Sequence, residues 1–101
     1  MLILPIKKKW YDMILSGEKK EEYREIKQYY RSRFENLELL DVYGLPRVAE
    51  ALIRFRNGYG SDCPSFTALC SLDIRGGKTE WGAEPNKQYY VLKILKIEEI
   101  K

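Results

Sequence analysis

A short charged stretch near the N-terminus combines residue types that can bind anions and carry protons. In LSGEKKEEYRE, residues 15–25, Gly17 precedes seven charged residues and one tyrosine. Lysine and arginine side chains neutralise phosphates, and a carboxylate between them accepts hydrogen bonds. The spacing of Gly17, Lys19, Glu22 and Arg24 indicates either a polar site or a solvated edge strand whose charges discourage aggregation.

The chain contains no histidine, and this limits the chemistry open to it. Serine–histidine and cysteine–histidine nucleophiles are excluded, so lysine, glutamate, aspartate, tyrosine and threonine remain as proton carriers. The two cysteines, Cys63 and Cys70, lack the partners of a structural zinc site. We therefore expect no metal and no cofactor, and we interpret Cys70 as a small buried hydrophobic residue.

Length and composition predict one folded unit over residues 1–101 that is neither membrane-spanning nor secreted. Of the residues, 45% are hydrophobic and 33% are charged, as in ordinary globular proteins. The apolar residues at the N-terminus precede Lys7–Lys9, which is the reverse of a secretory signal. These features favour a cytoplasmic protein.

The net charge of +3 is small, so a surface that attracts nucleic acid must be a local one. Eight tyrosines and two tryptophans lie among the basic residues, and cations beside flat aromatic rings are typical of single-stranded RNA recognition. Further candidates for RNA contacts are Arg54 and Arg56 in an alternating segment and Tyr59 and Trp81 in expected loops. The arginines have an alternative role as the outer face of a strand, and the aromatic residues as lids on the core.

The hydrophobic pattern changes period several times. Residues 2–6 predict a strand at a sheet edge or barrel rim because they include Pro5, and residues 7–16 predict a helix that ends at Gly17. Residues 18–37 fit either one long helix or a strand over 20–26 and a helix over 29–35. We prefer the second because a helix would align like charges four residues apart, as in Glu18 and Glu22.

The second half of the chain predicts strands separated by turns. After turns at 41–46, the strands are expected at 48–56, at 66–75 with Phe66, Ala68, Cys70, Leu72 and Ile74 on one face, and at 89–97 as a central strand. The fold class is α+β. We expect a small, strongly bent mixed sheet or barrel with helices at its open side.

The spacing Gly17-x-Lys19-x-x-Glu22-x-Arg24, after a strand and a helix, resembles the signature of the ASCH domain. This family belongs to the PUA-like β-barrel superfamily, and all four signature positions match. FRNGYG at 55–60 and the run YYVLKILKI resemble short stand-alone members more loosely. The resemblance implies a barrel of about five or six strands and two or three short helices beside a cleft that binds RNA or a nucleotide.

The resemblance also implies roles for the signature residues. Gly17 would form the turn out of the helix, Lys19 would project into the cleft as the cation for a phosphate or carbonyl, and Glu22 would accept from a base edge. Arg24 would grip a phosphate. Glu22 and Arg24, two residues apart on a strand, share one face.

Three functions compete for such a cleft. The first is binding of RNA or a nucleotide without turnover. The second is hydrolysis, with Lys19 and Glu22 as the candidate catalytic residues, because some family members behave as ribonucleases and others deacetylate acetylated cytidine. The deacetylating members use a threonine at the position of Glu22, so this chain lacks that nucleophile. The third is a regulatory protein-interaction domain. We favour binding, since Glu21 and Glu22 hold the Lys19 ammonium in its charged form against Lys20 and Arg24.

Overall fold

The computed structural model describes residues 1–101 as five strands, two α-helices and one 3₁₀ turn. In chain order these are β1 (Ile3–Ile6), α1 (Lys8–Leu15), β2 (Glu21–Arg24), α2 (Gln28–Asn36), β3 (Ala51–Asn57), β4 (Ser65–Gly76), η1 (Thr79–Trp81) and β5 (Gln88–Ile100). The α+β class is confirmed, and every predicted strand and helix is present with boundaries shifted by a few residues.

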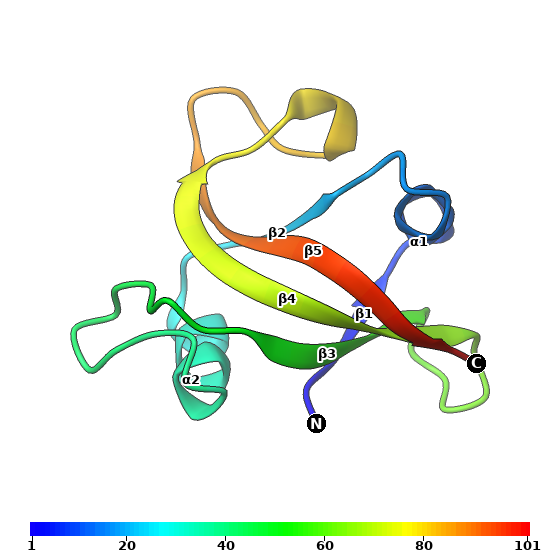
Figure 1. The fold of residues 1–101 in the computed structure, drawn as a ribbon. Helices are drawn as coiled ribbons and strands as arrows, with labels where there is room; N and C mark the ends of the chain where they lie inside the picture. Colours follow the sequence, from blue (N-terminus) through cyan, green and yellow to red (C-terminus); the bar gives the residue numbers. More distant parts are fainter.

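The strands form one curled mixed sheet in the order β1-β3-β4-β5-β2. The β1–β3 pair is parallel and the other three pairs are antiparallel. In Figure 1 the long strands β4 and β5 curve through the middle of the molecule, and α1 and α2 lie at opposite ends of the sheet. Because β1 and β2 each pair on one side only, they form the sheet's two edges, and Pro5 lies on an edge strand as predicted.

Residues 18–37 contain a strand and a separate helix, so the single long helix is excluded. Gly17 has φ of +85°, a left-handed conformation that glycine adopts without strain. Its amide donates to the Ile14 carbonyl at 3.1 Å, and the Lys19 amide donates to the Met13 carbonyl at 2.9 Å. The chain therefore reverses directly after α1, which places Lys19 beneath the helix end.

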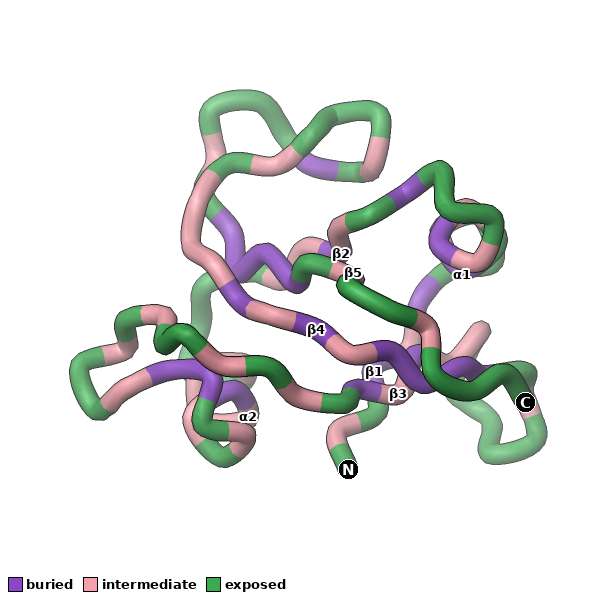
Figure 2. Tube along the Cα trace, in the orientation of Figure 1, coloured by how far each residue is buried: buried purple, intermediate pink, exposed green.

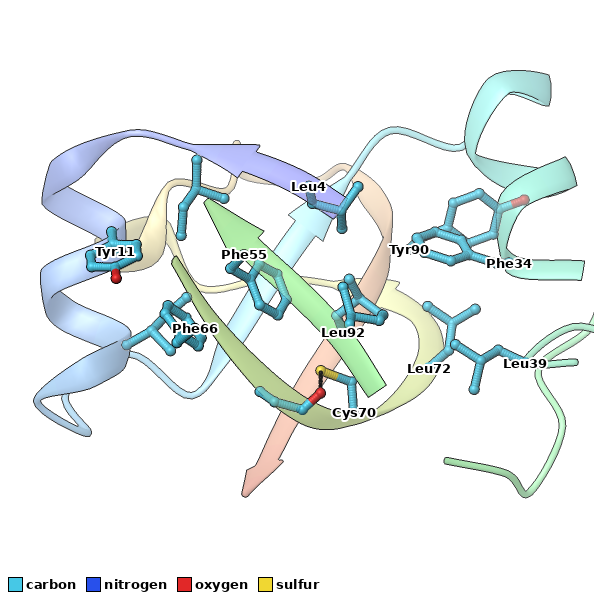
Figure 3. Packing of buried hydrophobic residues seen from close by; sticks show 14 of the residues in the cluster. Leu4, Tyr11, Phe34, Leu39, Phe55, Phe66, Cys70, Leu72, Tyr90 and Leu92 are labelled. Carbon is cyan, nitrogen blue, oxygen red and sulfur yellow. Dashed lines mark hydrogen bonds between the residues drawn. The ribbon is translucent and has the colours of Figure 1, made fainter. Parts of the chain in front are cut away.

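The core lies on the concave face of the sheet and is closed at each end by a helix. Figure 3 shows Phe55 of β3 beside Phe66 of β4, with Tyr11 of α1 at one end and Phe34 of α2 at the other. The predicted inner face of β4 is buried at Phe66, Ala68, Cys70 and Leu72 and half-buried at Ile74. Figure 2 shows that burial concentrates in the strands, whereas the loops are largely exposed.

The prediction that the last strand is buried on both faces is right only for its first half. Residues 89–92 are buried between β4 and β2. β2 is only four residues long and its last pair is Glu21 with Lys93. The Ile94 amide still donates to the Lys20 carbonyl at 2.9 Å, and beyond it β5 pairs with β4 alone. Leu95 is consequently 47% exposed.

Phe34 anchors α2, because it is the only buried residue of that helix. Its ring lies 5.3 Å from the ring of Tyr90 and 6.2 Å from that of Tyr30. We expect Phe34→Ala to lower the free energy of unfolding by about 3–5 kcal/mol, because the lost side chain leaves a cavity. Urea denaturation measures this change. Tyr29→Ala on the exposed side of the same helix is the control, and equal losses in both variants would contradict the anchoring role.

Candidate functional site

A buried network of three charged side chains joins the signature residues. The Glu22 carboxylate lies between two cations, with Oε1 3.1 Å from Lys19 Nζ and Oε2 3.1 Å from Arg24 Nη2. Glu22 and Arg24 point to the same face of β2 because they are two residues apart. Since two cations surround one carboxylate, the network carries an excess of positive charge.

Lys19 lies deeper than the sequence prediction placed it. Its side chain is 0% exposed, and Nζ donates to the Trp81 carbonyl oxygen at 2.7 Å in addition to Glu22. The ammonium also lies 4.8 Å from the ring centre of Trp10 and 4.9 Å from that of Tyr23. Lys19 does not project into a cleft as expected; it is enclosed by protein and supports the residues around it.

Arg24 connects the two edges of the curled sheet. From β2, its Nη2 donates to the Pro5 carbonyl oxygen of β1 at 3.0 Å as well as to Glu22. Its Nη1 lies 3.4 Å from the Tyr30 hydroxyl, and its Nε is buried without a hydrogen-bond partner. β1 and β2 are not paired with each other, so this guanidinium spans the seam that the sheet leaves open.

A cavity of about 490 Å³ opens at this seam, and we call it the seam cavity. Its lining comes from four segments, namely residues 5–10, residues 22–24 of β2, residues 57–59 at the end of β3, and residues 81–82 at the end of η1. Gly82 has φ of +101°, and a Cβ there would lie 3.0 Å from the Trp10 ring. A glycine at this position thus lets the η1 segment pack against α1 and form one wall.

Burial lowers the pKa of the Lys19 ammonium, and the nearby Glu22 carboxylate opposes this shift. The sequence argument considered only neighbouring charges, and it missed the loss of water as the largest influence. Burial also raises the pKa of Tyr23, whose hydroxyl donates to Glu21 and accepts from the Lys78 amide at 2.9 Å. Both side chains are held in place by these bonds.

The structure brings together most of the residues singled out in the sequence. Glu22, Arg24, Tyr59 and Trp81 line the seam cavity, and Lys19 lies directly against this lining. Arg54 and Arg56 do not line it. They occupy the opposite face of β3 from the buried Ile53 and Phe55, and Arg54 pairs with Glu99 at 3.4 Å.

Several lining residues were not identified from the sequence. Trp10 was assigned only to the first helix and Tyr23 only to a strand, although Tyr23 lies within the signature itself. Trp10 precedes Gly17 by seven residues, or two helical turns, and this spacing could have indicated that Trp10 lies on the same side of the helix as the signature. The contact of Lys19 with the Trp81 carbonyl has no sequence signal, because any residue provides that oxygen.

Comparisons with protein-family models, curated proteins and solved structures gave no significant match. The interpretation of the site therefore rests on its own geometry. No helix has the length and apolar character needed to cross a membrane. No three cysteine or acidic side chains are grouped so that they could hold a metal ion.

Replacing Lys19 by methionine is expected to destabilise the protein. The change keeps the length of the side chain but leaves the buried Glu22 carboxylate with Arg24 alone. We expect a loss of about 3 kcal/mol in the free energy of unfolding, the low end for breaking a buried ion pair. Urea denaturation at pH 7 measures it, and Lys20→Met, at an exposed neighbour without an ion pair, is the matched control. A loss no larger than that of the control would contradict a buried network.

The pH dependence provides an independent test of the buried ammonium. Because the Lys19 pKa is lowered on folding, the unfolded chain binds more protons between that pKa and about 10.4, so the stability contributed by this site rises with pH. The stability of the parent relative to Lys19→Met should therefore increase as the pH rises through the lowered Lys19 pKa towards about 10. Tyr11, Tyr23 and Tyr90 have raised pKa values and act in the opposite direction only near and above about pH 10. A flat or falling difference would contradict the lowered pKa.

Proposed function

We propose that this protein is an ASCH-type domain of the PUA-like group that binds RNA or a nucleotide in the seam cavity without turning it over. The observation that carries the proposal is that Glu22 and Arg24 line one cavity while the buried Lys19 supports its wall through Glu22 and the Trp81 carbonyl. The curled five-stranded sheet with two helices is compatible with such a barrel. The cavity volume lies within the range of about 300–1,000 Å³ that is typical of small-ligand sites.

The lining of the seam cavity matches the chemistry of a nucleotide. Four aromatic residues, Trp10, Tyr23, Tyr59 and Trp81, are part of it. Aromatic side chains bind unstacked bases by stacking, which contributes about 1–3 kcal/mol per base. Arg24 supplies the guanidinium, and Lys7 at the start of α1 makes no ion pair within the protein. In this proposal the aromatic side chains stack on the base, and Arg24 and Lys7 bind the phosphate in another part of the same cavity.

The position of Lys19 favours binding over hydrolysis. A general base or nucleophile must come within hydrogen-bonding reach of the reacting atom. The Lys19 ammonium has no exposed surface and already donates to a carboxylate and a carbonyl. Its role in this proposal is to fix Glu22 and the η1 wall and to add positive charge below the ligand.

Tyr59 is the most direct test of base stacking. It is 89% exposed although it lines the cavity, so few contacts within the protein depend on its ring. We expect Tyr59→Ala to weaken binding of a nucleoside monophosphate or a single-stranded RNA by about tenfold, in accordance with the loss of one stacked base. The melting temperature should stay unchanged. Isothermal titration calorimetry and thermal denaturation measure the two quantities.

Tyr43→Ala is the matched control, because Tyr43 is 80% exposed in the loop after α2 and does not line the cavity. Equal effects of both variants would place binding elsewhere on the surface. Absence of binding to all four nucleoside monophosphates and to RNA would overturn the proposal. Chromatography after incubation with acetylated cytidine or RNA completes the experiment, and multiple turnover that depends on Lys19 would favour the hydrolase.

A further inference from the structure

A second cavity lies beside the first and shares part of its wall. This lateral cavity has a volume of about 360 Å³ and is lined by residues 23–25, Lys27 and Tyr30 on one side and Gly82, Glu84, Lys87 and Tyr89 on the other. Tyr23, Arg24 and Gly82 belong to both cavities. The two hollows are therefore neighbours that meet at Arg24.

The two cavities differ in chemistry. The seam cavity is lined by two tryptophans and two tyrosines with three charged residues, whereas the lateral cavity is lined by three tyrosines with five charged residues. Lys87 pairs with Glu84 at 3.1 Å, and Glu25 adds a second carboxylate. Lys27 is different, because it makes no ion pair and its Nζ lies 5.4 Å from the ring centre of Tyr30. It is the cation of the lateral cavity that is free to meet an anion.

We infer that the ligand is a nucleic-acid single strand rather than a free nucleotide. One base lies in the seam cavity, the backbone passes over Arg24, and the next phosphate lies against Lys27 in the lateral cavity. Tyr30, half-buried, lies beside Lys27 with its ring centre 5.4 Å from the Lys27 ammonium. The inference rests on the proposed function, since it extends the same ligand from one cavity into the next.

Arg24 is suited to this central position. Its side chain is 13% exposed, and the guanidinium is fixed by Glu22 and the Pro5 carbonyl oxygen. An arginine whose planar fork is fixed in advance loses little freedom when a phosphate approaches. A strand that enters both cavities passes the wall that Tyr23, Arg24 and Gly82 share, and Arg24 is the one cation of that wall.

Binding titrations with ligands of two lengths test the inference. The probes are the four nucleoside monophosphates and a mixed-sequence single-stranded RNA tetranucleotide, each titrated at several salt concentrations. We expect the tetranucleotide to bind at least tenfold more tightly than any monophosphate. Lys27→Ala should weaken only the tetranucleotide and reduce the slope of log K against log salt by about 0.7, the value for one phosphate contact on a single strand.

Lys93→Ala is the matched control, because Lys93 is an exposed lysine of β5 that lines neither cavity. The Lys27 side chain makes no cap hydrogen bond and no ion pair, and it contacts α2 only through its ammonium over the Tyr30 ring, so its substitution should change the melting temperature little. If monophosphates bind but the tetranucleotide is no tighter, or if Lys27→Ala has no effect on it, the inference is wrong and the proposed function stands. If neither ligand binds, both are overturned.

Discussion

The arrangement around the seam depends on the buried carboxylate of Glu22. A carboxylate removed from water is costly unless cations and hydrogen-bond donors surround it. Lys19 and Arg24 provide these cations, and each of them also binds a carbonyl oxygen of another segment, at Trp81 and Pro5 respectively. One ionised group thereby connects Lys19 in the turn after α1 with strands β1 and β2 and with the η1 segment.

The cavity exists because the curled sheet does not close. A fully closed barrel would pair β1 with β2 and fill the space between them with backbone hydrogen bonds. Here one arginine side chain bridges the two edges instead, and the adjoining space remains open to ligands. The short length of β2 and the proline of β1 both limit edge pairing, so the features that weaken closure also create the site.

Local patterns in the sequence predicted the elements well, whereas the depth of individual side chains depended on tertiary structure. Gly17 and the like charges after it correctly separated α1, β2 and α2, because helix termination and charge spacing act within a few residues. Alternation correctly identified the inner face of β4. The burial of Lys19 could not be predicted this way, since it depends on Trp10 and on an η1 segment more than sixty residues away.

The positions of Arg54 and Arg56 show that residue type alone does not predict which cations line a cavity. Both have the residue type of an RNA contact, but alternation places them on the face of β3 that points away from the core. Arg24 belongs to the signature, the seam lies beside it, and two cavities meet there. Whether a cation lines a cavity depends on where its strand lies in the sheet. Arg24 lies on the edge strand β2 beside the open seam, whereas the arginines of β3 lie on a strand paired on both sides.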